Sequence, residues 1–271
     1  MSPEVKPTSK GTALVTGASS GIGEEFARQL ASQGYDLLLV ARREERLRIL
    51  ARELQAQYGV KADVMAIDLS KSEGIQQVEA AIKGCPSLQV LVNNAGFGVI
   101  GNFWEVESKV HLDMISVHVL GTVAFCRAAL PGMIAHHQGV IINVSSISAF
   151  TPLGGNATYN AVKAYLVTFT QTLANELKGT GVCVQALCAG FTHTGLHSTP
   201  VFLTGRKLSG IPKFMWMDPP EVVRLSLNAL KHKHVVFVPG FKNQLLVLAI
   251  RMGIIRLMRG FIGWWYRKHD R

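Results

Sequence analysis

Tyr159 and Lys163 stand four residues apart, and Ser146 precedes Tyr159 by thirteen positions. One helical turn separates the first two, so their side chains share a face near the start of a helix predicted over 157–178. Tyr-x-x-x-Lys by itself is common on helix surfaces. Ser146, at the end of a predicted strand, changes the interpretation, because its hydroxyl can hydrogen-bond a substrate oxygen while Tyr159 exchanges the proton. The three residues predict a hydride-transfer site.

The proposed chemistry places a requirement on the tyrosine. A free tyrosine has a pKa near 10, about three units above neutrality, and is a poor base. A Lys163 cation would stabilise the phenolate and bring the pKa closer to working pH. A nicotinamide would supply the hydride, and the protein would supply orientation and the proton.

A turn of small residues, Thr16-Gly17-Ala18-Ser19-Ser20-Gly21-Ile22-Gly23, lies between the first predicted strand and the first predicted helix. Small residues let the backbone approach a pyrophosphate, whose charge is favoured at a helix N-terminus. A glycine-rich turn alone is weak support, but this placement favours a nucleotide site. The residues predicted to bind the cofactor here are Gly17, Ser19, Ser20, Gly21, Ile22 and Gly23.

The second predicted strand ends in Ala41-Arg42-Arg43. An NAD site would place an acidic residue here for the ribose hydroxyl, and Ala41 cannot serve. Arg42 can form charge-assisted hydrogen bonds to a 2′-phosphate, so the sequence predicts NADP (NADPH) as the cofactor. The alternative is that Arg42 and Arg43 simply open a charged helix.

Further candidates follow the third and fourth predicted strands. Asp68 could accept a hydrogen bond from an adenine amino group, or it could cap the next helix. The sequence Asn93-Asn94-Ala95-Gly96 comes at the carboxyl edge of the sheet, where ligands bind in such folds. The asparagines can tie neighbouring strands together while Gly96 gives the backbone room. Asn94, Ala95 and Gly96 are therefore predicted to line the cofactor site.

Short apolar runs alternate with helical patterns from Gly11 to about Gly240, which predicts one α/β domain with a doubly wound parallel sheet. The strands are predicted at Thr12–Thr16, Asp36–Val40, Ala62–Ile67, Val90–Val92, Val140–Val144, Cys183–Leu187 and Val235–Val238. The helices are predicted near 22–33, 44–57, 72–83, 107–136, 157–178 and 219–231. The irregular segment 191–217, with its exposed-looking aromatic residues, is expected to be a lid or binding loop.

The 271 residues can bury a core without disulfides or metals, and the four cysteines lack the spacing of a metal site. We expect free thiols in a reducing compartment and no metal. The polar N-terminus has no apolar core of a secretory signal, so a cytoplasmic location is expected.

The C-terminal segment 241–271 carries seven Lys or Arg residues against one acid, and so supplies +6 of the net charge of +10. On a helical wheel its apolar residues gather on one face and its arginines on the other. Arginines interrupt every apolar run before it could span a membrane. A basic amphipathic helix at a membrane surface is favoured, and an oligomer contact or a flap over the substrate pocket is the alternative. Nucleic acid is not expected as a partner, because the basic residues lie on the same helix as a wide apolar face.

Over residues 11–240 the chain resembles the short-chain dehydrogenase/reductase family. The matching motifs are TGASSGIG (16–23), NNAG (93–96), Ser146, YNAVK (159–163) and the Gly190…Thr194 segment. The resemblance implies a Rossmann-type sheet, an NAD(P) cofactor bound in part by Tyr159 and Lys163, Ser/Tyr/Lys catalysis, and often a homo-oligomer. It also implies that Gly190, Thr192 and Thr194 contact the nicotinamide carboxamide. Within the family, NNAGFG, ELKGTGV and ALCAG resemble DltE-like, 3-oxoacyl and steroid reductases.

Two residues depart from the family pattern. His118 stands where the family usually has an Asn that helps hold a water leading to the lysine. His118 can donate and accept, so it is a candidate catalytic residue that could add charge near Lys163 at low pH. It could equally be a packed helix residue. Ala189 replaces the Pro of a usual Pro-Gly pair, which would loosen the turn that orients the nicotinamide.

Together these features predict an NADPH-dependent carbonyl reductase, or the reverse alcohol dehydrogenase, acting on a small apolar substrate of lipid or steroid type. The predicted organisation is a catalytic domain over 1–240 followed by the amphipathic helix over 241–271. The rival hypothesis is an NADPH-binding membrane adaptor with little catalysis, which His118 and Ala189 motivate.

Overall fold

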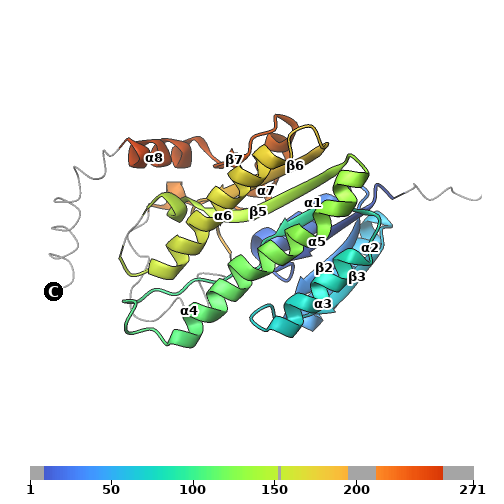
Figure 1. The fold of residues 1–271 in the computed structure, drawn as a ribbon, viewed down its shortest axis with the longest axis horizontal. Helices are drawn as coiled ribbons and strands as arrows, with labels where there is room; N and C mark the ends of the chain where they lie inside the picture. Colours follow the sequence, from blue (N-terminus) through green and yellow to red (C-terminus); the bar gives the residue numbers. More distant parts are fainter. Residues whose placement is uncertain (1–8, 152–153, 195–211, 253–271) are drawn as a thin grey trace, which may run out of the picture.

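The computed structural model describes residues 9–151, 154–194 and 212–252, and a parallel sheet of seven strands forms its centre (Figure 1). The strand order is β3-β2-β1-β4-β5-β6-β7, and every neighbouring pair is parallel. The strands are β1 (Thr12–Thr16), β2 (Asp36–Ala41), β3 (Ala62–Ala66), β4 (Leu88–Asn93), β5 (Gly139–Ser146), β6 (Val182–Ala189) and β7 (Val236–Phe237). The predicted doubly wound α/β fold is confirmed, with each strand within a few residues of its predicted place.

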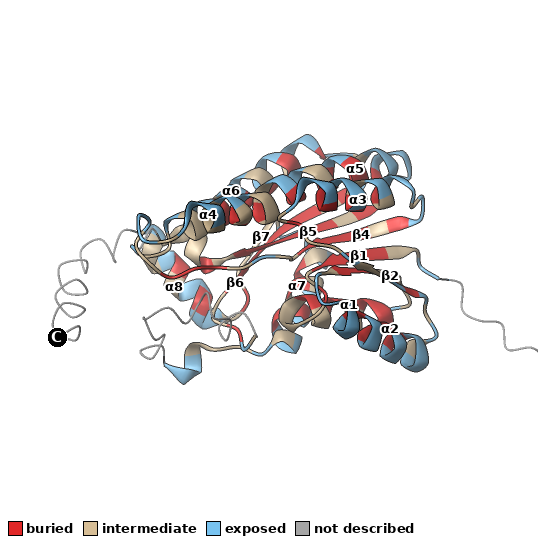
Figure 2. Cartoon of the chain, turned by 90° about the horizontal axis from the view of Figure 1, so that it is seen from below, coloured by how far each residue is buried: buried red, intermediate tan, exposed pale blue. Residues whose placement is uncertain are grey.

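Helices cover both faces of the sheet (Figure 2). One layer holds α1 (Gly21–Ser32), α2 (Glu44–Tyr58) and α7 (Pro219–Lys231). The other holds α3 (Ser72–Lys83), α4 (Ser108–Ile115), α5 (Gly121–Ala135) and α6 (Ala157–Glu176). Successive strand residues point to opposite faces, so Ala13 and Val15 enter the apolar core under the first layer while Leu14 enters the core under the second. Both faces are buried, which explains why the strands read as continuous apolar runs.

The helix predicted over 107–136 is interrupted. A π-helical turn, η1 (Ser116–Leu120), separates α4 from α5 and holds His118 in the interior. Such turns widen the helix locally and are frequent at functional sites. By length and composition, the stretch Ser108–Ala135 is the one described helix that could span a membrane. Because α5 packs on β4, β5 and α3, we interpret it as a core helix.

The irregular segment 191–217 and the C-terminal tail are each described only in part. Residues 195–211 of the predicted lid lie outside the described residues, and so do 253–271 of the tail. The tail does begin as a helix, α8 (Phe241–Arg251), which contacts the 3₁₀ turn η2 (Ile147–Phe150) directly after β5. All four cysteines are free thiols, as predicted.

The sheet reverses its winding direction between β1 and β4, which lie side by side although two strands intervene in sequence. Open α/β sheets bind ligands at the carboxyl edge beside such a reversal. The turn after β1, the Asn-rich turn after β4 and the end of β5 all reach this edge, so the fold brings the predicted site residues to one place.

Candidate active site

The turn after β1 has the backbone that a bound dinucleotide requires. Gly17 and Gly21 have φ of +68° and +59°, in the left-handed region that favours glycine. A Cβ at Gly23 would lie 2.3 Å from the Gly17 carbonyl oxygen, so no larger residue fits. Ser20 is the N-cap of α1 but makes no side-chain cap, which leaves the first helical N–H groups for another acceptor. Ile22 packs on the core beneath the turn. These features fit a pyrophosphate at the N-terminus of α1.

Asn94 and Thr16 join the turns after β1 and β4. The Asn94 amide donates to the Thr16 carbonyl oxygen at 2.9 Å, and the Thr16 hydroxyl accepts from the N–H groups of Asn94 and Ala95 at 2.9 and 3.0 Å. One strand further, the Asn93 amide donates to Asn143 of β5 at 2.8 Å. The prediction that the asparagines tie neighbouring strands is confirmed, and the ties fix the floor of the candidate cofactor site.

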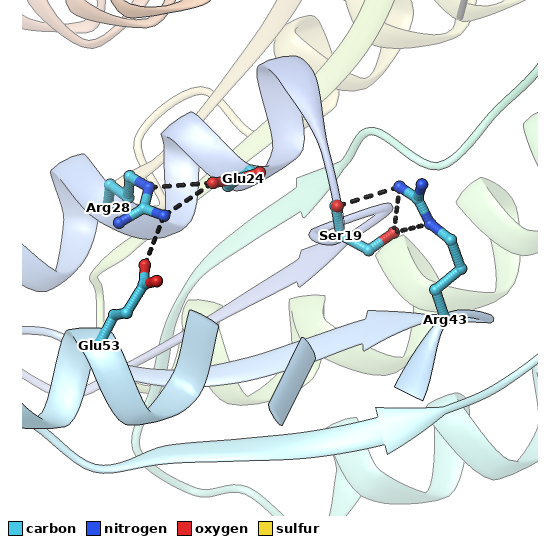
Figure 3. Close-up of polar contacts among 5 residues, drawn as sticks. All are labelled: Ser19, Glu24, Arg28, Arg43 and Glu53. Atoms are coloured by element: carbon cyan, nitrogen blue, oxygen red, sulfur yellow. Dashed lines mark hydrogen bonds and ion pairs between the residues drawn. The ribbon is translucent and has the colours of Figure 1, made fainter. Parts of the chain in front are cut away.

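Arg43 holds the glycine-rich turn from the side of β2. Its guanidinium donates to the Ser19 carbonyl oxygen at 3.0 Å and to the Ser19 hydroxyl at 3.0 and 3.2 Å (Figure 3). In a separate cluster, Arg28 of α1 pairs with Glu24 of the same helix and with Glu53 of α2, both at 2.7 Å, and so links α1 to α2 (Figure 3). Sequence reasoning missed the contact of Arg43, because two consecutive arginines give no signal of which one turns toward the loop.

Arg42 is exposed at the end of β2, near Asp68 at the end of β3. Partial burial opposes ionisation of Asp68, but the hydrogen bonds from Ser70 and the charges of Arg42 and Lys71 outweigh it and hold the pKa of Asp68 below its usual value. The Asp68 carboxylate accepts from the Ser70 N–H at 3.0 Å, and the N-cap of α3 is Lys71. The alternative that Asp68 caps the next helix is therefore wrong, since it closes a turn before that helix.

The segment Gly190–Thr194 follows β6 and crosses to the glycine-rich turn. A Cβ at Gly21 would lie 2.8 Å from the Thr194 side chain, so the two predicted cofactor contacts are direct neighbours. Thr192 is buried, with its hydroxyl donating to the Gly190 carbonyl oxygen at 3.1 Å. Ala189 is the last residue of β6, in register with Ser146 of β5, so the sheet itself holds this position.

Ser146, Tyr159 and Lys163 converge beside this edge. Ser146 ends β5, and its hydroxyl is hydrogen-bonded to the phenol of Tyr159 near the start of α6. One turn further along α6, the Lys163 Nζ lies 5.5 Å from the centroid of the Tyr159 ring and donates to the Val144 carbonyl oxygen at 2.8 Å. Ser145 anchors the same turn, since its hydroxyl donates to the Lys163 carbonyl oxygen at 2.8 Å.

The electrostatics of this cluster differ from the expectation. Burial raises the pKa of Tyr159, and the hydrogen bond to Ser146 offsets it only in part, whereas a lowered value was predicted. Burial also lowers the pKa of Lys163 to about 7, with only the neighbouring Cys188 acting in the opposite direction. The prediction of a full lysine cation beside the phenol is thus too simple, because the interior disfavours both charged forms.

His118 is 2% exposed and points from the π-helical turn to the backbone after the Asn-rich turn. Its Nε2 lies 2.9 Å from the carbonyl oxygen of Phe97 and 3.1 Å from the Phe97 nitrogen, so either tautomer forms one hydrogen bond there. The ring meets the Tyr159 ring edge-on at 6.1 Å, and a Cβ at Gly96 would lie 2.1 Å from it. His118 is both a packed residue and a neighbour of Tyr159.

Burial and the charge of Lys163 hold the pKa of His118 well below its ordinary value. Both effects disfavour the charge near Lys163 that His118 was expected to add at low pH. Through its contact with Phe97, the ring supports the backbone beside Tyr159. Among the described residues, no group of three or more His, Cys, Asp or Glu side chains could hold a metal.

Comparison with known proteins gives one family and a consistent set of relatives. A family model described as short chain dehydrogenase matches residues 11–200. An uncharacterized oxidoreductase of Staphylococcus epidermidis is 35% identical over 197 residues, which cover 72% of this chain and 84% of that protein. A very-long-chain 3-oxoacyl-CoA reductase of Laccaria bicolor is 35% identical over 178 residues, which cover 65% of this chain and about half, 53%, of that reductase.

The fold comparison agrees. The structure of a short-chain dehydrogenase from Sphingobium yanoikuyae in complex with NADPH superposes with a TM-score of 0.80 at 28% sequence identity. The superposition covers 93% of this chain and 95% of that one. The similarity extends beyond residue 200, where the family model stops, and therefore includes described residues of the C-terminal part.

Proposed function

Because the chain belongs to the short-chain dehydrogenase/reductase family, and is thus an oxidoreductase of alcohols or ketones, we propose that it transfers hydride between NADP(H) and the carbonyl or secondary alcohol of an apolar substrate. The observation that carries the proposal is the convergence of three residues at the sheet edge beside the glycine-rich turn: Ser146 at the end of β5, Tyr159 on α6, and Lys163, whose Nζ lies 5.5 Å from the centroid of the Tyr159 ring. A nicotinamide bound against Gly190–Thr194 would supply the hydride.

Each residue of the cluster has a distinct task in the proposed reaction. Ser146 donates a hydrogen bond to the substrate oxygen and so stabilises the negative charge that develops on it. Tyr159 gives its phenolic proton to that oxygen during reduction, and takes it back during oxidation. Lys163, whose pKa of about 7 populates both of its protonation states near neutrality, stabilises the phenolate that remains.

We propose NADPH as the physiological cofactor because Arg42 offers a cation, and Ala41 no carboxylate, at the end of β2. Replacing Arg42 with alanine is expected to weaken NADPH binding about 10- to 100-fold, as loss of a charge-assisted contact costs roughly 1.5–3 kcal/mol. NADH binding should change less than about twofold. Fluorescence titration with both cofactors measures the effect, and Arg46→Ala on the exposed face of α2 is the control. Equal weakening of NADH and NADPH would contradict the role of Arg42.

The proposal of an apolar substrate rests on two features. Phe214 is 63% exposed beside α8, and Phe150 lies directly after the strand that carries Ser146. The similarity to a reductase of very-long-chain 3-oxoacyl-CoA supports the same class.

An exposed apolar stripe along α4 to α5, at Leu112, Ile115, Leu120 and Val123, supports the proposal that copies of the chain associate.

We also propose that α8 rests on a membrane surface. Its outward face exposes Phe241, Leu245, Leu248 and Met252, and its cations Lys242 and Arg251 lie over aromatic rings at 5.0 and 4.7 Å. The combined variant Phe241→Ser, Leu245→Ser and Leu248→Ser should float with anionic liposomes about tenfold less than wild type, because each leucine- or phenylalanine-sized side chain contributes roughly 1.5–3 kcal/mol when fully buried. The paired variant Ile49→Ser and Ile134→Ser, exposed elsewhere, is the control. Unchanged flotation of the α8 variant would contradict the proposal that α8 binds a membrane surface.

A further inference from the structure

Asn243 is a buried polar residue of the tail helix, outside the residues that match the family model. It stands near the start of α8 and is only 2% exposed. Its amide Nδ2 donates to the Pro239 carbonyl oxygen at 3.0 Å and lies 3.4 Å from the sulfur of Met217. Asn243 thus joins the start of α8 to two other segments that come together at the carboxyl edge of the sheet.

The third neighbour of Asn243 is Gly190. A Cβ built at Gly190 would lie 2.4 Å from Nδ2 of Asn243 and 2.7 Å from both its Cγ and its Oδ1. The amide group therefore fills the space that a side chain at position 190 would need. Gly190 opens the segment Gly190–Thr194, whose far end touches the glycine-rich turn through Thr194. A displacement of Asn243 would therefore directly change the packing of this segment.

Met217 holds the same segment along its other edge. Its N–H donates to the Phe191 carbonyl oxygen at 2.9 Å, and its carbonyl oxygen accepts from the His193 N–H at 3.0 Å. Since the Met217 sulfur also contacts Asn243, the backbone of Met217 and the side chain of Asn243 together form one brace around the segment. This brace is built from residues after 211, and it confines a backbone that lacks the proline usual before Gly190.

The hydrogen-bonding groups of the Asn243 amide are satisfied only in part. Its Oδ1 is buried and has no hydrogen-bond partner. An unsatisfied buried polar atom destabilises a fold, and an apolar side chain of similar size would avoid the penalty. The amide thus combines one satisfied donor, to Pro239, with an unpaired oxygen that lies against Gly190.

We propose that Asn243 is a positioning residue that holds Gly190–Thr194 in the conformation that receives the nicotinamide end of the cofactor. This inference rests on the proposed function, because it requires that a nicotinamide dinucleotide binds at this edge. The proposal makes α8 part of the cofactor site. The outward face of this helix is apolar and exposed, and its inward face holds the segment Gly190–Thr194, against which the nicotinamide would lie.

The inference predicts that Asn243→Leu weakens only one half of the cofactor site. Binding of NADPH should weaken about tenfold, because small displacements of a positioning wall are costly. Binding of adenosine 2′,5′-bisphosphate, which carries the adenine half and lacks the nicotinamide, should stay within about twofold of wild type. Isothermal titration of both ligands gives the comparison. Asn228→Leu, at an exposed position of α7, is the matched control and should bind both ligands as wild type does.

A second variant, Asn243→Ser, keeps the test decisive if the leucine variant does not fold, and the same selective loss is expected of it. Unchanged NADPH binding, or equal weakening of both ligands, would overturn the inference and leave the proposed function intact. A wild-type chain that bound neither ligand would instead overturn the proposed function, and the inference with it.

Discussion

Replacing Tyr159 with phenylalanine is expected to lower kcat for NADPH-dependent ketone reduction by about 10²–10⁴-fold, the usual contribution of a positioned proton donor. The change removes only the hydroxyl that Ser146 contacts. The ring keeps its packing against His118 and its position over the Lys163 Nζ. NADPH affinity and melting temperature should therefore stay near the wild-type values. The loss of activity would then come from a slower chemical step.

The measurement is NADPH oxidation with a panel of lipophilic ketones, together with a titration of NADPH binding. Tyr165→Phe is the matched control, since Tyr165 lies on the same helix, is 40% exposed and stacks on Phe169 away from the site. Full activity of Tyr159→Phe would refute the proposed mechanism. Tight NADPH binding by the wild-type chain without turnover of any ketone would favour the rival hypothesis of a cofactor-binding adaptor.

Replacing Lys163 with methionine is expected to change activity and stability in opposite directions. Ketone reduction should fall by about 10²–10⁴-fold, because the phenolate of Tyr159 loses its cation. The folded chain should become more stable at pH 7 by on the order of 2 kcal/mol, since burial lowers the pKa of Lys163 to about 7 and the charged form is disfavoured inside the protein. For a chain of this size that corresponds to roughly 4–8 °C in melting temperature.

The pH dependence of this stability difference follows from proton binding. In the unfolded chain a lysine titrates near 10.4, so above that pH both states carry a neutral amine and no penalty exists. As the pH falls from about 10.4 to about 7, the unfolded chain takes up a proton that the folded chain does not, and folding becomes less favourable. Below about pH 7 both states are protonated and the penalty is constant. The advantage of Lys163→Met should thus be largest at pH 7 or below and disappear toward pH 10.5.

Thermal unfolding of the cofactor-free chain at several pH values between 6 and 10 would measure the effect. Lys178→Met, an exposed lysine just beyond α6, controls for the loss of a surface charge. A Lys163→Met variant that melts below wild type at pH 7 would show that the hydrogen bond to Val144 outweighs the cost of burial.

The sequence alone determined the order of strands and helices, since the alternation of apolar runs with helical patterns reflects burial on both faces of one sheet. It also determined which residues reach the carboxyl edge, because the motifs stand directly after strands. The turn after β1, the Asn-rich turn and Ser146 could each be located from local chemistry. The spacing of Tyr159 and Lys163 follows from one helical turn.

Only the tertiary structure decided the contacts between segments distant in sequence. It selected Arg43 as the partner of Ser19, turned His118 inward at a π-helical turn, and placed Asn243 against Gly190. It also set the charge of the site, because the burial that lowers the pKa of Lys163 comes from strands and helices packed around it. Local sequence carries the identity of a side chain and its place on an element. Its neighbours and its solvation are properties of the packed whole, and they decided how the predicted site is held together.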